Sequence, residues 1–287
     1  MEIQHLRYVV AVADTGTFTE AARRCFVAQP SLSQSVRRLE QELGTELFVR
    51  SGRAVTLTAA GDAFVAAARP ALRSFDAVAA EVDAVAGLTV GRLDLVALPT
   101  LALDPVAPLV GAFRRRHPGV TVRIAHPEGT AALLHSVRTG ARELGITERP
   151  ARAPDLVVTP LDRQEIVAAF PPGVRVPETL RARDLADQPI VTQPVGTSTR
   201  ALLDQMLGSA GVAATIAVET DQRELIMPLV EQGAGVALVP LPVAERSAAS
   251  GVGIHRFRPP LWRDLVVVRR EGPPSPAARA FLDELLV

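Results

Sequence analysis

The sequence lacks several features that would assign it to a class at once. Its 287 residues include one cysteine, Cys25, which excludes an internal disulfide framework and a zinc site built on cysteines. We interpret Cys25 as a small buried hydrophobe, with a redox switch as the alternative. No run of about 18 uncharged apolar residues occurs, so no membrane-spanning helix is expected. The N-terminal segment MEIQHLRYVV lacks a basic stretch followed by an apolar core, unlike a signal peptide, and we expect a cytoplasmic protein.

Excess charge is also absent. The chain has 31 basic and 31 acidic residues, so any surface for nucleic acid must be local. The five histidines are scattered without metal-ligand spacing, and no Gly-x-Ser-x-Gly motif is present. We therefore expect no enzymatic activity, no metal and no cofactor. The length and an apolar content of 48% favour two or three domains with cores of their own.

The first 58 residues contain the pattern of three short helices. The first has apolar residues at helical spacing, at Ile3, Leu6, Val10 and Ala13. Gly16 should end it, and Thr17 with Glu20 forms a predicted capping box for the second helix. Pro30 suits the first turn of the third. Two short helices joined by a tight turn predict a helix-turn-helix from Phe18 to Arg37.

The third predicted helix has two different sides. Its apolar side is formed by Leu32, Val36, Leu39 and Leu43. Its other side carries hydroxyls, amides and guanidiniums, and the N-terminal residues of such a helix contact base edges in DNA. The residues predicted to contact DNA are Gln29, Pro30, Ser31, Ser33, Gln34, Arg37 and Arg38, the arginines toward phosphates. From the pattern alone, a three-helix scaffold with a solvated face is the alternative.

The segment after this helix predicts a β-hairpin wing. ELFVR and AVTL have the composition of strands, and SGR between them that of a turn. Arg50 and Arg53 would lie near its tip and suit contacts to phosphates. Between Arg23 and Arg53 there are six arginines against three glutamates, a local positive excess in a neutral protein.

A family resemblance covers this whole region. The stretch FTEAARRCFVAQPSLSQSVRRLEQELGTELFVRSGRAVTLTAAG resembles the N-terminal domain of LysR-type transcriptional regulators. Those proteins share the motifs Gln-Pro-x-Leu-Ser, Leu-Glu-x-x-Leu-Gly-x-x-Leu-Phe-x-Arg and Leu-Thr-x-x-Gly. The resemblance implies that residues 1–58 form a winged helix-turn-helix domain that binds double-stranded DNA. It also implies a homo-oligomer, in this family usually a tetramer.

Residues 59–88 predict a linker helix that forms a dimer. Its apolar residues follow a heptad spacing, at Phe64, Ala68, Ala71, Phe75, Val78, Val82 and Val85. Such a seam is typical of a contact between two helices, and a helix packed on its own domain is the alternative. Pro70 should kink this helix or split it into two segments.

Residues 89–287 alternate strands and helices, which predicts an α/β domain with parallel-rich sheets. Proline-rich stretches near 150–160 and 259–260 suggest crossovers between lobe I, at 89–160 and 260–287, and lobe II, at 161–259. The segments HPGVTVRI, LVEQGAGVALVP and SPAARAFLDEL resemble the effector-binding half of LysR-type regulators. The resemblance implies a two-lobed domain similar to a periplasmic binding protein. A stand-alone solute-binding protein would explain this half alone.

Polar loops at the ends of predicted strands indicate an effector site between the lobes. The residues predicted to contact the effector from these loops are Thr100, Leu101, Gly129, Thr130, Pro194, Thr197 and Ser198. Two of the loops open helices, and the free N–H groups there suit a small anionic metabolite. Simple helix capping by Thr130, Thr197 or Ser198 is the alternative. The family resemblance implies ligand contacts at Thr100 and Thr130, and Thr147, Thr220 and Asp221 are predicted to border the same cleft.

Overall fold

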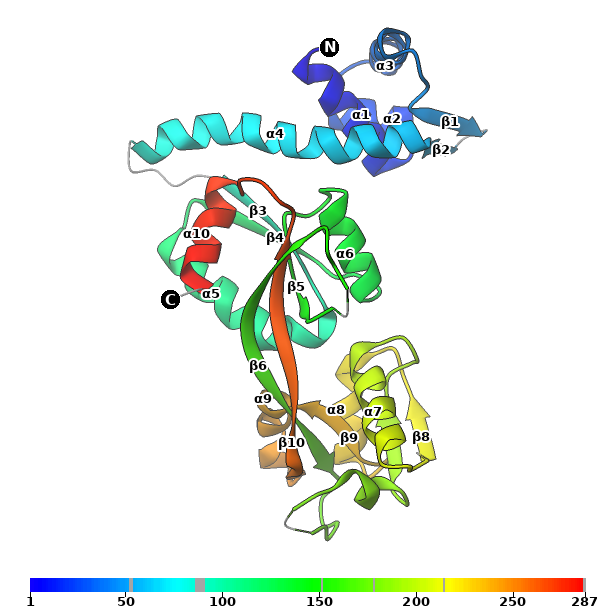
Figure 1. Cartoon of the computed structure of the whole chain (residues 1–287), viewed down its shortest axis with the longest axis vertical. Helices are drawn as coiled ribbons and strands as arrows, with labels where there is room; N and C mark the ends of the chain where they lie inside the picture. The colour runs from blue at the N-terminus through cyan, green and yellow to red at the C-terminus, as the bar shows by residue number, and fades with distance from the viewer. Residues whose placement is uncertain (52–53, 86–90, 151, 178, 214, 286–287) are drawn as a thin grey trace.

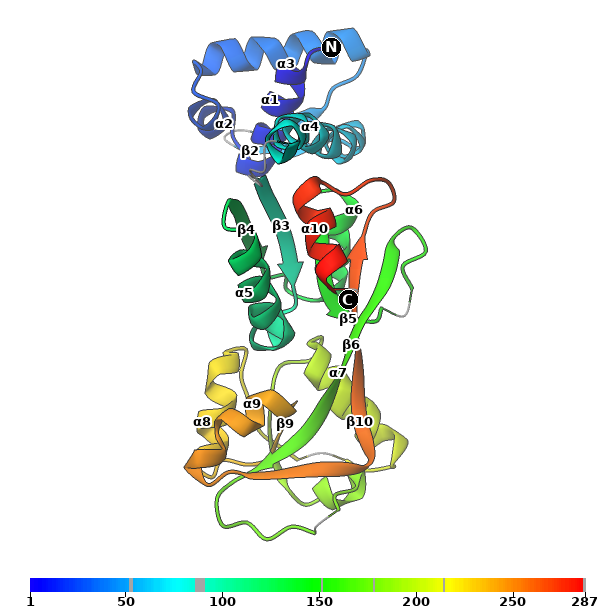
Figure 2. The ribbon, with the colours of Figure 1, turned by 90° about the vertical axis from the view of Figure 1, so that its left-hand side faces the viewer.

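The computed structural model describes residues 1–51, 54–85, 91–150, 152–177, 179–213 and 215–285. Figure 1 shows the N-terminal helices at one end, the long helix α4 next to them, and an α/β half that extends to the other end. Figure 2, turned by 90°, agrees that α4 lies between the N-terminal helices and the α/β half. The long helix is therefore in a position to connect the two ends of the molecule.

Residues 1–58, called the head from here, fold as three helices and a hairpin. The elements are α1 (Ile3–Thr15), α2 (Phe18–Arg24), α3 (Gln29–Leu43) and the antiparallel strands β1 (Phe48–Ser51) and β2 (Ala54–Leu57). Gly16 ends α1 with a φ of 67°. The backbone N–H of Glu20 donates to Oγ1 of Thr17 at 3.2 Å, as an N-cap requires. The structure confirms the predicted helices, the turn between α2 and α3, and the wing.

Two details of the predicted apolar faces are wrong. On α1 the buried residues are Tyr8, Val9, Ala11 and Val12, while the predicted stripe is only partly buried. The second half of α1 is apolar on both sides, so the spacing could not decide which side packs against the core. On α3, Leu43 is 41% exposed because it is the last residue of the helix, before the chain turns at Gly44.

Helix α4 (Ala59–Val85) runs without interruption, so Pro70 does not split it, and the alternative of a kink stays a prediction. A proline has no N–H, and it leaves the carbonyl four residues earlier without its helical partner. That carbonyl belongs to Ala66, and Arg270 of the α/β half donates a hydrogen bond to it at 3.4 Å. The neighbouring domain thus supplies the donor that the proline lacks.

The start of α4 lies close against the wing. The backbone N–H of Gly61 donates to Oγ1 of Thr58 at 2.9 Å. A Cβ atom at Gly61 would lie 2.0 Å from the carbonyl oxygen of Leu47, which no side chain could tolerate. The glycine of the Leu-Thr-x-x-Gly motif is therefore required for the approach of α4 to the head.

The α/β half contains a six-stranded sheet in the order β4-β3-β5-β10-β6-β9 and a separate pair, β7 and β8. Its strands are β3 (Gly91–Ala97), β4 (Val120–Ala125), β5 (Leu144–Glu148), β6 (Val157–Phe170), β7 (Pro189–Thr192), β8 (Thr215–Glu219), β9 (Ala237–Pro240) and β10 (Gly253–Arg269). Its helices are α5 (Ala107–Arg116), α6 (Thr130–Arg138), α7 (Ser198–Ser209), α8 (Ile226–Glu231), α9 (Leu241–Arg246) and α10 (Pro276–Leu285). The short turns η1 to η5 span Pro99–Leu101, Ala102–Val106, Ala182–Leu185, Arg223–Leu225 and Ala248–Ser250. The sequence pattern missed α9.

Strands form the crossovers between the two lobes, and prolines of the two predicted stretches lie within them. β6 and β10 form a long antiparallel pair that passes from one lobe into the other (Figure 1). Pro160 lies inside β6, and Pro259 and Pro260 lie inside β10, where the register shifts between Arg256 and Leu261. The sheet is mixed rather than parallel-rich, because β10 carries the chain back into lobe I antiparallel to β5.

Each lobe has its own core. One cluster joins β3, β5, α5, α6, α10 and the second half of β10, with Phe113 and Phe281 among its fully buried side chains. Two further clusters cover opposite faces of the sheet in lobe II, around Phe170 and around Val167. Among the described residues, no helix is both long and apolar enough to cross a membrane.

Candidate functional site

The outward side of α3 is the first candidate surface. It carries six of the predicted DNA-contacting residues in exposed positions, namely Gln29, Pro30, Ser31, Gln34, Arg37 and Arg38. In Figure 2, α3 runs along the end of the molecule that lies farthest from lobe II. Within the described part of the chain, neither Arg37 nor Arg38 forms an ion pair. This surface can therefore offer both amides and unneutralised guanidiniums to a polyanion.

Ser33 is far less exposed than those six residues. Only 8% of it is exposed, beside Leu32 and three residues before Val36, which are both buried. Ser33 lies one helical turn from the exposed Gln29 and Arg37, but its own side chain is largely covered, and its contact to bases stays a prediction. Arg50 lies in β1, but its side chain and the whole of Arg53 fall outside the described residues.

The turn between α2 and α3 holds two residues of note. Phe26 is 95% exposed and has a φ of 56°, which a residue with a side chain adopts rarely. The sequence showed only an apolar residue before a turn, and nothing in it marked this exposure. Cys25 is partly buried against the core of the head, and burial raises the pKa of its thiol. A raised pKa disfavours the reactive thiolate, which favours the structural interpretation of Cys25.

A polar cluster connects the two lobes at the middle of the molecule, and we call it the interlobe junction. Its members are Thr100 of lobe I, Ser198 of lobe II, and Gln164 and Arg263 of the connecting strands. Nη1 of Arg263 donates to Oγ1 of Thr100 at 3.3 Å and to Oγ of Ser198 at 3.2 Å. Nη2 of Arg263 donates to Oε1 of Gln164. One guanidinium thus holds groups from both lobes.

Charge at the junction is balanced. Arg263 is 5% exposed, and burial lowers its pKa to about 10, while the charges of Glu148 and Asp104 act in the opposite direction. Gln164 donates to the Asp104 carboxylate at 2.7 Å. Burial raises the pKa of Glu148, whose carboxyl is hydrogen-bonded to Thr130. The charge of Arg223 also acts on Arg263, so two cations and two carboxylates influence one another here, and the cluster has no surplus of positive charge.

The other residues predicted to contact the effector lie in several environments. Leu101 is fully buried in the core of lobe I, so its side chain cannot contact an effector, and that prediction is wrong. Thr147 is also fully buried, and its hydroxyl has no hydrogen-bond partner among the described residues. A Cβ at Gly129 would lie 3.8 Å from the carbonyl oxygen of Gly196, so these two loops meet.

Helix capping does not explain the predicted threonines. Gly129, not Thr130, is the N-cap of α6, and Thr197 at the N-cap of α7 makes no capping hydrogen bond. Thr197 instead donates from Oγ1 to the carbonyl of Pro194 at 2.8 Å. Thr220 accepts from the backbone N–H of Gln222 at 3.1 Å, and the neighbouring Asp221 is exposed.

A large cavity lies beside the junction, between the lobes, and we call it the interlobe cavity. Its volume is about 1010 Å³. Lobe I contributes mainly apolar side chains to its wall, including Thr100, Leu103, Val106, Val110 and Ile124. Lobe II contributes Gln193, Thr199, Arg223, Ile226, Met227 and Val243 among others. Of the ten residues predicted to contact an effector, Thr100 alone lines this cavity.

Arg223 is the notable cation of this cavity. Its Nε and Nη1 atoms are buried and have no partner among the described residues. Nη2 makes one long hydrogen bond, to Oε1 of Gln193 at 3.4 Å. Burial lowers the pKa of Arg223, partly offset by the charge of Glu224. A buried guanidinium with unpaired donors is unfavourable unless an anion completes it.

A winged helix-turn-helix head joined by a long helix to a two-lobed α/β half is the architecture of a DNA-binding regulator. The chain belongs to the LysR family of transcriptional regulators. Residues 86–286 match the family described as the LysR substrate binding domain. Residues 3–62 match the bacterial regulatory helix-turn-helix protein of the lysR family. This membership confirms the predicted fold class and DNA-binding class.

Individual relatives agree with this membership. The regulator ShiR of Corynebacterium glutamicum (strain R) is 31% identical over 242 residues, which cover 83% of this chain and 82% of ShiR. AlsR of Bacillus subtilis (strain 168) is 29% identical over 244 residues, or 84% of this chain and 80% of AlsR. A full-length cysteine-to-aspartate variant of OxyR from Pseudomonas aeruginosa superposes with a TM-score of 0.82 at 26% identity, covering 100% of this chain and 95% of OxyR. CbnR in complex with its target DNA, at 24% identity, a TM-score of 0.65, and coverage of 100% and 99%, supports the fold alone.

Proposed function

We propose that this LysR-type regulator binds double-stranded DNA as a homo-oligomer and that an anionic small molecule between its lobes changes that binding. The working units are the predicted ones: a DNA-binding domain at 1–58, a linker helix at 59–88 and an effector domain at 89–287. Its relatives are regulators and not enzymes. Because its main partner is DNA, we place its action in the cytoplasm.

Arg223 is the single observation that carries the anionic effector. The junction around Arg263 holds two carboxylates, and Arg263 leaves only its Nε without a partner, so an added anion is less favoured there. Arg223 faces an apolar cavity with two nitrogens unpaired. A carboxylate on Arg223 with an apolar body against Val106 and Ile226 would satisfy both features. The proposed effector is therefore a carboxylic acid with an apolar body.

The predicted effector residues then divide into two groups. Thr100 lines the cavity and also bonds to Arg263, so it is suited to sense the ligand and pass its effect to the junction. Gly129, Thr130, Thr147, Pro194, Thr197, Ser198, Thr220 and Asp221 do not line the cavity. Their contacts to an effector stay predictions.

The exposed apolar residues of α4 support the oligomer. Phe75 is 51% and Val78 63% exposed, whereas Phe64 packs against the head and Ala68 is 3% exposed. The first part of the seam therefore packs on its own domain, as the alternative had it. The next part stays exposed, with Arg7 over the Phe75 ring at 5.8 Å and Val78 at the edge of a cavity between α4 and lobe I. Val82 and Val85 have side chains outside the described set.

The test compares carboxylic acids with their amides. In thermal-shift measurements on the full chain, acids with an aromatic or branched aliphatic body should raise the melting temperature, because a ligand of the folded state stabilises it. The isosteric amides should not, since they carry no charge for Arg223. A set of ligands that are all neutral or cationic would refute the anionic effector while leaving DNA binding untouched.

A further inference from the structure

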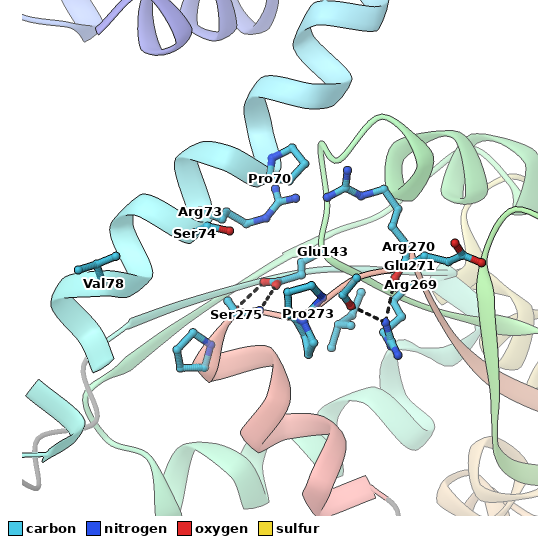
Figure 3. Close-up of a pocket in the computed structure, with 14 residues that line it drawn as sticks. Pro70, Arg73, Ser74, Val78, Glu143, Arg269, Arg270, Glu271, Pro273 and Ser275 are labelled. Atoms are coloured by element: carbon cyan, nitrogen blue, oxygen red, sulfur yellow. Dashed lines mark hydrogen bonds between the residues drawn. The ribbon is translucent and has the colours of Figure 1, made fainter. Parts of the chain in front are cut away.

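A second cavity lies where α4 meets lobe I, and we call it the linker cavity (Figure 3). Its volume is about 390 Å³. One wall is formed by Pro70, Arg73, Ser74 and Val78 of α4, and the other by Glu143, Leu144 and residues 269–276. It shares no lining residue with the interlobe cavity, so what binds in it would be independent of the proposed effector.

Two guanidiniums meet at this place. Figure 3 shows Arg73 from α4 and Arg270 from the end of β10 pointing toward one another. A Cβ at Gly140 would lie 3.3 Å from both Cζ of Arg270 and Nη2 of Arg73, so both cations touch the same small residue. Burial lowers the pKa of each, and the charge of Arg270 lowers the pKa of Arg73 further. Two like charges are thus held close together in a partly buried environment, where water screens them less.

Neither cation has an anionic partner of its own. Arg73 donates to the carbonyl of Gly140 at 2.7 Å, and Arg270 to the carbonyl of Ala66 at 3.4 Å. Among the described residues, neither takes part in an ion pair. The charge of Glu143 favours both cations, but its two oxygens already accept hydrogen bonds from Ser275, at 2.7 and 2.9 Å.

Both guanidiniums have N–H donors that remain available to a ligand. Each has five N–H groups and uses only one nitrogen in a hydrogen bond. None of their nitrogens is among the buried atoms that lack a partner, so their free donors reach solvent-accessible space. Arginine forks of this kind suit the oxygens of carboxylates and phosphates.

We propose that the linker cavity is a second ligand site, which binds a compact oxyanion, a carboxylate or a phosphate group, between Arg73 and Arg270. The anion neutralises the two cations, and each of them already bridges α4 and lobe I through a carbonyl. Its binding therefore stiffens the contact between the effector domain and the helix that carries the head. The site makes that contact sensitive to an anion other than the effector.

The test uses the full chain at constant ionic strength with chloride as the reference. Inorganic phosphate and succinate are the two probes, and the one that binds tells whether the site prefers a phosphate or a carboxylate. At least one should raise the melting temperature, with a Kd measurable by calorimetry. Arg73→Gln and Arg270→Gln should each weaken that binding by about 10–100-fold, the loss of a charge-assisted hydrogen bond. Arg175→Gln, which removes an exposed cation of lobe II outside both cavities, should not weaken it.

Binding of neither probe to the wild type, or equal binding to the Arg73 and Arg270 variants, would overturn the proposal. Hydrogen exchange on the wild type makes the test independent of how the variants fold. The bound anion should slow exchange at residues 70–74 and 140–145 and leave residues 226–231 of the interlobe cavity unchanged. Slowing at 226–231 instead would assign the anion to the interlobe cavity and refute the second site.

Discussion

The head and the effector half place the same kind of cation in opposite surroundings. In the head, Arg37 and Arg38 lie exposed on α3. In the effector half, Arg263 is buried and Arg223 is half-buried between the lobes, with its Nε and Nη1 atoms covered. The sequence contains no lysine, so every cation in both regions is an arginine.

The difference in burial gives the two regions different selectivity. Exposed guanidiniums attract any polyanion, and salt screens that attraction within about 8–10 Å. A buried guanidinium is screened little and is stable only with a partner of matching shape and charge. The head can therefore hold DNA of many sequences and leaves discrimination to residues such as Gln29, whereas the cavity around Arg223 selects one class of small anion. A substitution that abolishes DNA binding by the head should therefore leave effector binding intact, and the reverse should also hold.

The largest expected effect comes from the part that connects them. Val78→Asp places a charge on the exposed apolar stretch of α4, where a partner helix would bury it without a counter-ion. We expect a monomer in light scattering and the loss of binding to paired half-sites. Val78→Leu is the matched control and should stay oligomeric. If the aspartate variant keeps the wild-type mass, the oligomer forms elsewhere.

The next effect separates the effector from DNA. Arg223→Gln should weaken binding of the carboxylic acid by about 10–100-fold, because a charge-assisted hydrogen bond is lost. DNA affinity without ligand should stay at the wild-type value in a gel-shift titration. Arg246→Gln removes an exposed cation at the same cavity and should bind the acid normally. An equal loss of affinity in both variants would show that the acid responds to the overall positive charge around the cavity and not to Arg223 in particular.

Most of the structure of the head could be predicted from the sequence, whereas little of the interlobe cavity could be. The helices α1 to α3 could be predicted because their signals are local in the sequence. These signals are the helical period and the end and cap residues Gly16, Thr17 and Pro30. The burial of Ser33 did not follow from the period, which places it near both the buried Val36 and the exposed Arg37. The interlobe cavity joins Leu103 with Arg223, which are far apart in sequence, and a single arginine before a helix carries no mark of burial. The prolines lie within the two crossover strands but did not predict strands there, because a proline disfavours a regular strand.

Within the head, base contacts and phosphate contacts should also separate. Gln29→Ala should lose about 1–3 kcal/mol at the preferred DNA site and blur its sequence preference. Arg37→Ala should weaken binding to all sequences alike and reduce the salt slope by about one. Competition with random-sequence DNA at several salt concentrations distinguishes the two. If Gln29→Ala weakens binding to all sequences equally, the start of α3 does not recognise bases.

A smaller effect tests the role of Ser33. Ser33→Ala removes a largely covered hydroxyl from α3, so we expect a change in stability within about 1 kcal/mol and an unchanged DNA preference. The neighbouring Ser31→Ala alters an exposed hydroxyl and serves as the comparison. Loss of sequence preference in the Ser33 variant alone would assign this residue to the DNA-contacting surface.

The smallest effect should arise from pH and should concern lobe II rather than the head. The ring of His255 packs edge-on against Phe170 with centroids 5.3 Å apart, and burial lowers its pKa below the usual 6.5. As pH falls through 6.5, the unfolded chain takes up the proton before the folded one, so stability is complete above this pH and declines below it. His255→Gln should flatten this decline between about pH 7 and pH 5 in thermal unfolding. Hydrogen exchange should show earlier opening of β6 and β10 in lobe II, while α1 to α3 keep their protection. An equal decline in the glutamine variant would assign the pH dependence to the carboxylates, and the buried histidine would then have no part in it.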